Sequence, residues 1–209
     1  MTARDFRHDT PIDRSTSAYT LPKTSSYIRI QIGDDWLPTA VNLSTGWKKA
    51  FDATQYAESI MDSYRYFVLE RAIRMIESGR QGSPTLPSLR EAAPTLLRAR
   101  TYDEYLNTLE QLMGSATYSA HGQGCNAFDE PAITVEANHA GLTRIAIDPD
   151  WALSADSFTI AYDITDCCNQ IRALKPQITA DAYLDSESDG QLAERLVDHM
   201  KQLLRSDLG

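Results

Sequence analysis

Apolar and polar residues alternate in two separate parts of this chain, and each alternating stretch is followed by a turn and a second such stretch. The first runs over residues 28–32 and resumes over 37–43 after Gly33-Asp34-Asp35. The second runs over 133–137 and resumes over 142–147. A period of two residues is typical of strands with one buried face. We therefore expect two antiparallel β-hairpins.

The two hairpins share their spacing. Their first strands begin 105 positions apart, at Ile28 and Ile133, and the alternation ends 104 positions apart, so a one-residue difference in the turn aligns them. A tryptophan follows each hairpin, at Trp47 and Trp151, and an amphipathic stretch comes next. This pattern predicts an α+β fold of two repeated units, each a β-hairpin plus a long helix, that form a pseudo-dimer within one chain.

Apolar residues then recur every three or four positions, which predicts helices near 52–78, 102–118, 154–175 and 189–206. We expect the apolar faces of 53–78 and 156–173 to form the core. The positions expected to face inward are Tyr56, Ala57, Ile60, Tyr64, Phe67, Val68, Ile73 and Ile76 in the first of these helices, and Phe158, Ala161, Tyr162, Thr165, Cys168 and Ile171 in the second.

Turn-forming residues divide the chain into four parts. Residues 1–26 are polar and contain two prolines, which predicts an extended N-terminal arm. Residues 27–79 form the first repeat, and 80–100, with three prolines, form the predicted linker. Residues 101–209 hold the second repeat and a C-terminal helix.

The net charge of −9 is unevenly distributed along the 209 residues. Residues 1–128 carry 14 basic and 14 acidic side chains, whereas 129–209 carry 6 basic and 15 acidic ones. An acidic surface repels phosphate backbones, so nucleic acid is a disfavoured partner. The N-terminus lacks the apolar core of a secretory signal, and no apolar run approaches the roughly 18 residues that span a bilayer. We expect a cytoplasmic protein without a membrane partner.

The sequence offers no convincing site for chemistry. Three cysteines, at 125, 167 and 168, lack the spacing of a disulfide framework or a zinc site. The stretch from Asp185 to Gly190 begins like a calcium loop, but its twelfth position is Leu196 rather than an acid. We therefore expect no catalytic residue, no metal and no cofactor, and hence no enzyme.

The second hairpin and its flanks are similar to a known family. A strand over 133–136, a turn with Gly141, a strand ending in Asp148-Pro149 and a helix opening with Asp156 resemble the YbaB/EbfC family over residues 102–175. In the first copy Leu43-Ser-Thr-Gly replaces the Asp-Pro step, and that copy looks more like the YbaB-like accessory proteins of actinobacterial type VII (ESX) secretion. The resemblance implies either cytosolic accessory factors that chaperone or recruit substrates, or dimeric nucleoid-associated DNA-binding proteins.

The charge distribution favours the first branch, a cytoplasmic protein-binding module of secretion-accessory or chaperone type. The candidate contact residues are Trp36, Trp47, Tyr66 and Trp151, although the matched positions of Trp47 and Trp151 favour the core for those two. In the alternative, a YbaB-like DNA-binding protein, the contacts come from Arg65, Arg71, Arg74 and Arg80. A further alternative is a subunit that completes a homodimer.

Overall fold

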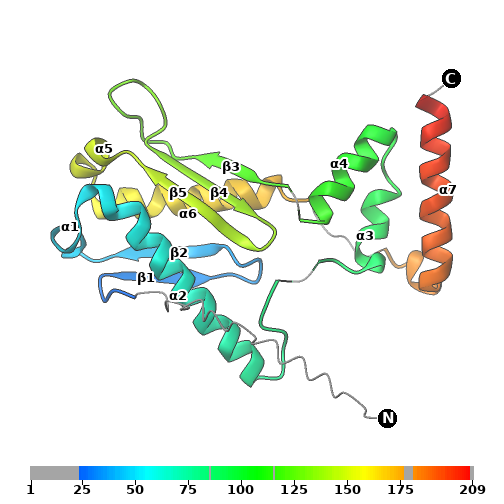
Figure 1. Cartoon of the computed structure of the whole chain (residues 1–209), viewed down its shortest axis with the longest axis horizontal. Helices are drawn as coiled ribbons and strands as arrows, with labels where there is room; N and C mark the ends of the chain where they lie inside the picture. Colours follow the sequence, from blue (N-terminus) through cyan, green and yellow to red (C-terminus); the bar gives the residue numbers. More distant parts are fainter. Residues whose placement is uncertain (1–23, 85, 115, 177–180, 208–209) are drawn as a thin grey trace, which may run out of the picture.

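The fold combines two small antiparallel sheets with helices. The structure, a computed structural model, describes residues 24–84, 86–114, 116–176 and 181–207, and these form seven α-helices and five strands. The predicted N-terminal arm at 1–26 falls mainly on residues 1–23, which lie outside the described residues. The expected mixture of helices and antiparallel strands is confirmed (Figure 1).

The first sheet is the hairpin predicted from the first alternating stretch. Strand β1 (Ile28–Ile32) pairs antiparallel with β2 (Pro38–Leu43), with Ile30 opposite Val41. The register shifts between Gln31, which pairs with Ala40, and Ile32, which pairs with Pro38, so Thr39 of β2 is the extra residue of a β-bulge next to the turn.

The second sheet has three strands, in the order β3-β4-β5. Strand β4 (Ile133–Asn138) and β5 (Gly141–Ile147) form the second predicted hairpin, and β3 (Tyr118–His121) pairs antiparallel with β4. The prediction of one helix over 102–118 was wrong at its end, because the helix stops at Leu112. Gly114, with a positive φ of 77°, then turns the chain.

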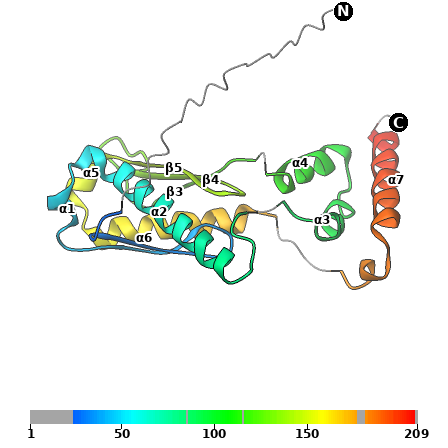
Figure 2. The same ribbon diagram turned by 60° about the horizontal axis from the view of Figure 1, so that its bottom comes forward.

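Two long helices pack on the sheets. Helix α2 (Tyr56–Glu77) lies against β1 and β5, and α6 (Ser157–Leu174) lies against β2, β3 and β4 (Figures 1 and 2). A short helix precedes each of them, α1 (Trp47–Ala50) and α5 (Pro149–Ser154), and a 3-10 turn over Ala53–Gln55 leads into α2. The Asp156 side chain caps α6 by accepting a hydrogen bond from the backbone N–H of Thr159 at 2.6 Å.

The faces of these two helices form the main core, as predicted, but the predicted stripes extend too far. In α2 the exposed fractions of Ile73 and Ile76 are 47% and 65%. The helix has 22 residues, or about 33 Å, and β1 has five residues, or about 17 Å, so the end of α2 passes beyond the strand. In α6 Phe158 and Tyr162 are 77% and 51% exposed, because the buried stripe runs through the face of Ile160 instead.

A second, separate core is built from helices alone. Helix α3 (Leu89–Leu96) packs against α4 (Tyr102–Leu112) and α7 (Asp189–Asp207), with a 3-10 turn at Leu184–Ser186. The three helices lie together at one end of the molecule (Figure 1). The predicted linker at 80–100 thus includes α3, and α4 and α7 pack on it rather than on the second hairpin.

Candidate functional site

A groove of about 560 Å³ runs between strand β1 and the C-terminal half of helix α2. Its strand side comes from residues 29–32 of β1, and its helix side comes from residues 67–75 of α2 and from Arg80 just after it. We name it the arginine groove, and its lining consists of Arg29, Ile30, Gln31, Ile32, Phe67, Glu70, Arg71, Arg74, Met75 and Arg80.

The arginine groove is a basic site in an acidic protein. Four arginines and one glutamate line it, whereas the whole chain carries a net charge of −9. Arg74 lies 3.5 Å from Glu70 in an exposed ion pair, and Arg80 Nε donates to the Ser78 hydroxyl at 3.2 Å. Arg29 has no ion pair with any residue in the described ranges. The groove therefore has cationic capacity left for an anionic ligand.

Arg71 closes one end of the groove. Its Nη1 donates to the carbonyl oxygen of Ile32 at 3.0 Å, and its Nη2 forms an ion pair with Asp34. The guanidinium carbon lies 5.7 Å from the centre of the Trp36 ring, within the range of a cation–π contact. These contacts hold α2 to the turn of the first hairpin, so Arg71 supports the site more than it offers a free charge.

The strand side of the groove is a backbone edge. Four consecutive residues, 29–32, line it, although alternate side chains point to opposite faces of the sheet. The bond from Ser44 N–H to Tyr27 O, at 2.9 Å, fixes the pairing, so Arg29 and Gln31 direct their backbone groups toward β2. Ile30 then directs its N–H and C=O away from β2, into the groove.

The structure separates the predicted row of arginines. Arg71, Arg74 and Arg80 line the groove, but Arg65 does not. Arg65 lies on another side of α2 and makes ion pairs at 2.8 Å with both Glu58 and Asp62. The hydrogen bond that Arg65 donates to the Glu58 carboxylate raises the pKa of Arg65 above its ordinary value.

The sequence reasoning missed Arg29, which lies on β1 and not on the helix. The signal was the charge inside an apolar strand, between Ile28 and Ile30. A period-two pattern assigns such a residue to the solvent side, and it does not say which helix comes to lie beside it.

The predicted aromatic contact residues occupy different environments. Trp36 and Trp47 are buried, with exposed fractions of 6% and 0%, because they lie under α2 and beside Tyr56 respectively. Their side chains are therefore covered, and neither offers a surface to a partner. Tyr66 and Trp151 are half-buried and stay candidates for contact.

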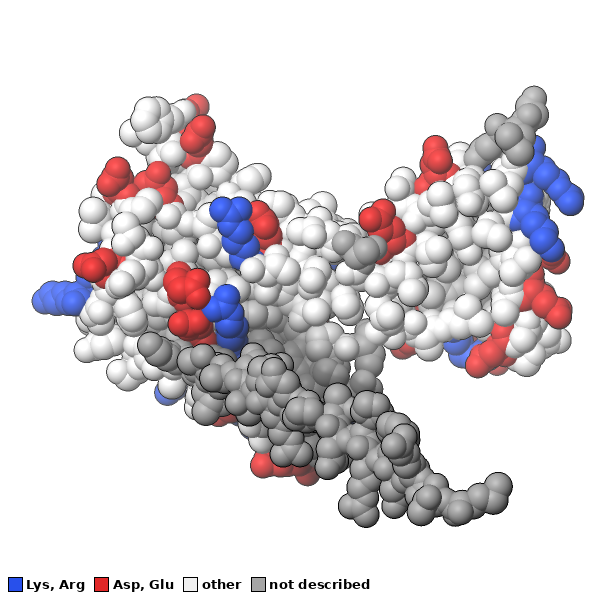
Figure 3. All heavy atoms as spheres, in the orientation of Figure 1, with Lys and Arg blue, Asp and Glu red and all other residues white. Residues whose placement is uncertain are grey.

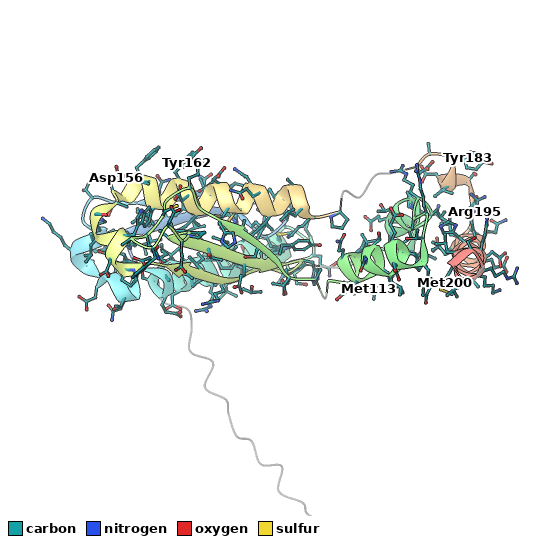
Figure 4. All side chains as sticks on the ribbon, turned by 90° about the horizontal axis from the view of Figure 1, so that it is seen from above. Met113, Asp156, Tyr162, Tyr183, Arg195 and Met200 are labelled. Atoms are coloured by element: carbon teal, nitrogen blue, oxygen red, sulfur yellow. The ribbon has the colours of Figure 1, made fainter. Side chains whose placement is uncertain are left out.

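A pair of exposed aromatic side chains was missed because they were expected in the core. The rings of Phe158 and Tyr162 stack with their centroids 6.3 Å apart. Figure 4 shows Tyr162 on the outer side of α6, near Asp156 at the start of the helix. A shallow hollow of about 230 Å³ separates the pair from residues 39–42 of β2.

The described residues show no sign of a metal site or of a membrane span. Within 24–84, 86–114, 116–176 and 181–207, no group of three or more histidine, cysteine or acidic side chains comes together in a way that could hold a metal ion. None of the described helices has both the length and the apolar character to cross a membrane.

The comparisons with known proteins return no relative. The chain matches no protein family, no curated protein and no solved structure. The proposed function therefore rests on the residues and charges of the arginine groove.

Proposed function

We propose that this chain is a non-enzymatic, cytoplasmic protein-binding module of secretion-accessory or chaperone type, and that it takes its partner in the arginine groove. The observation that carries the proposal is the groove itself. It combines four arginines, apolar residues such as Phe67 and Met75, and a strand edge, all in a chain with a net charge of −9. A polypeptide with acidic and apolar side chains matches all three features.

The proposal includes a tandem YbaB-like architecture, in which two hairpin-plus-helix units form a pseudo-dimer. The pairing of the hairpins supports it. Ile30 pairs with Val41 in the first and Val135 with Ile145 in the second, at offsets of 105 and 104. Both hairpins have their bulge at the same step, after Gln31 and after Glu136.

Bonds and packing outside the strands support the same architecture. The bond from Ser44 N–H to Tyr27 O, at 2.9 Å, has its counterpart from Asp148 N–H to Ala132 O, at 2.8 Å. Each long helix also packs on the first strand of its own hairpin and the second strand of the other, α2 on β1 and β5, α6 on β4 and β2. Such reciprocal packing is what a pseudo-twofold axis requires.

Three observations favour a protein partner over the alternative, a YbaB-like DNA-binding protein. The cations face a groove between one strand and one helix, whereas a specific DNA interface spreads over about 1,000–2,500 Å² of protein surface. Of the arginines proposed for DNA, Arg65, Arg71 and Arg74 are paired with carboxylates of this chain. On the face seen in Figure 3, basic and acidic side chains are interspersed among the described residues.

Fluorescence anisotropy with two labelled probes tests the proposal. One probe is a six-residue peptide of alternating glutamate and valine, and the other is a 20-base-pair DNA duplex, each titrated with the full chain at about 50 and 200 mM salt. We expect the peptide to bind and the duplex to show no saturable binding. The variants Arg74→Ala and Arg80→Ala should weaken peptide binding, because both side chains line the groove.

Arg65→Ala is the matched control, since Arg65 is on the same helix but outside the groove. It should leave peptide binding unchanged. Duplex binding that weakens steeply with salt would move the assignment to DNA. If neither probe binds, the groove is not the partner site and the proposal fails.

A further inference from the structure

The geometry points to strand addition: we propose that an extended, acidic segment of a partner protein pairs antiparallel with the free edge of β1, in the place that β3 takes on β4. This inference rests on the proposed function, because it specifies how the arginine groove holds a protein. It also names the chemistry of the partner, which is an extended segment with acidic and apolar residues in alternation.

The second sheet contains an example of the proposed pairing. Strand β3 lies antiparallel on β4, with Ala120 opposite Val135. The Gly122 N–H donates to the Ile133 carbonyl oxygen at 2.9 Å. This bond shows that Ile133 and Val135 direct their backbone groups toward β3, away from the other strand of the hairpin.

On the corresponding edge of β1, the equivalent alternate residues direct their backbone N–H and C=O groups away from β2. With the offset of 105, Ile133 and Val135 correspond to Ile28 and Ile30. Ile30 directs its N–H and C=O into the groove, and the described residues place no strand against this edge. An edge of unpaired N–H and C=O groups is a template for another chain.

The groove limits the length of the added strand. At its turn end, the Ile32 carbonyl oxygen already accepts the hydrogen bond from Arg71 Nη1 at 3.0 Å. At the other end, the Ile28 N–H donates to the Ser25 carbonyl oxygen at 3.2 Å. The groups left for pairing include the Ile28 C=O and both groups of Ile30, which matches a short strand such as the four-residue β3.

The charges decide which segment fits. Arg29 projects from the strand on the side opposite the buried Ile28 and Ile30, and Arg74 and Arg80 reach the groove from the end of α2. Because alternate side chains of an added strand point to opposite faces, its acidic side chains all lie on one face, beside Arg29 or beside Arg74 and Arg80, and its apolar side chains lie on the other. Glu70 opposes an acidic ligand, but it is compensated by Arg74 at 3.5 Å. Arg29 and Arg80, which have no ion pair among the described residues, therefore favour an acidic over a basic segment.

Backbone methylation of the probe tests the pairing itself. In a β-strand only every second N–H faces a given neighbour. Two analogues of the glutamate–valine peptide are therefore compared, each N-methylated at one of the two alternate sets of residues. We expect one analogue to bind at least about tenfold more weakly than the parent peptide and the other to stay within about twofold, since one lost backbone bond plus a steric clash exceeds roughly 1.4 kcal/mol. A peptide with lysine for glutamate should not bind.

Amide hydrogen exchange of the full chain gives a second readout at a single residue. The Ile30 amide should exchange rapidly in the free protein and slow at least about tenfold with the peptide bound. The Arg29 and Gln31 amides, which face β2, should change little. An Ile30 amide that is already protected without peptide would show that the edge is occupied, and would overturn the proposal.

The outcomes separate this inference from the proposed function. If both methylated analogues bind like the parent while Arg29→Ala and Arg80→Ala still weaken binding about tenfold, the groove binds protein but not by strand addition. If the unmodified peptide does not bind, the proposed function itself falls. Arg65→Ala serves again as the control that should change neither readout.

Discussion

The hydroxyl group of Tyr64 joins the two hairpins. It donates to the carbonyl oxygen of Trp36 at 2.9 Å and accepts a hydrogen bond from the Leu142 N–H, also at 2.9 Å. Both bonds are buried, and the side chain of Tyr64 is 4% exposed. Burial raises the pKa of Tyr64 to about 12, although the bond from Leu142 lowers it in part.

We expect Tyr64→Phe to lower the free energy of unfolding by about 1–3 kcal/mol at neutral pH, because two buried backbone groups lose their partner. The folded-state pKa is raised, so the stabilisation is complete below pH 10, the ordinary value, and is lost as the pH rises toward 12. The loss of stability between pH 10 and 12 should therefore be smaller in Tyr64→Phe. Urea unfolding at several pH values measures both effects.

Tyr66→Phe is the control for this prediction, because Tyr66 is half-buried on the same helix. It should change the free energy of unfolding by less than about 0.5 kcal/mol. Burial also raises the pKa values of the Cys167 and Cys168 thiols to about 12. These thiols therefore add a further loss of folding stability above pH 9, which is the same in every variant. An identical alkaline loss in the wild type and in Tyr64→Phe would contradict the prediction.

At the scale of elements, a single arginine joins α6 to the turn of the first hairpin. Arg172 Nε donates to Asp35 Oδ2 at 2.7 Å, and its Nη2 donates to the carbonyl oxygens of Leu37 and Pro38 at 3.1 and 2.8 Å. Arg71 of α2 binds the same turn, at Ile32 and Asp34. The first hairpin is thus held at its turn by both long helices.

We expect Arg172→Met to destabilise the protein by about 1.5–3 kcal/mol, because the charge-assisted bonds to two carbonyls and a carboxylate are lost together. Chemical denaturation followed by tryptophan fluorescence measures the change. Arg144→Met is the matched control, since Arg144 makes one ion pair with Glu136 at 3.1 Å and is 64% exposed. Equal effects of the two substitutions would show that the turn contacts add nothing.

At the scale of the whole molecule, the two hydrophobic cores share no buried residue. One contains the sheets with α2 and α6, and the other contains α3, α4 and α7. Figure 3 shows two lobes of described atoms with a hollow between them. Two cores that are separate in this way can unfold in separate transitions.

Leu192 tests this independence, because it is fully buried in the helical core. Leu192→Ala should lower the free energy of unfolding of the helical core by about 2–5 kcal/mol. In amide hydrogen exchange, α3, α4 and α7 should lose protection while β4 and β5 keep theirs. Val197→Ala, on the same helix but 43% exposed, should leave both regions unchanged. A uniform loss of protection across the molecule would mean that the two cores unfold as one.

Several elements followed from local pattern alone. The period-two alternation predicted both hairpins, and the three-to-four spacing predicted α2, α6 and α7 nearly to their ends. Strand β3 was missed because its four residues are too few for a period to stand out, and because the preceding apolar helix pattern runs into it. Short elements depend on a neighbour for their stability, and β3 has β4.

The chain determined by itself where apolar and polar residues recur, and therefore which segments become strands and helices and which of their sides is apolar. Only the tertiary structure decided where each apolar stripe ceases to be covered. Ile76 belongs to the same helical pattern as Ile60 but lies beyond β1, and Tyr162 lies on a side of α6 away from the buried stripe of Ile160. The arginine groove depends on packing too, because Arg29 of β1 and Arg80 after α2 line it together although they are far apart in the sequence. Periodicity is a local property of the sequence, whereas burial depends on the lengths and positions of elements far apart along it.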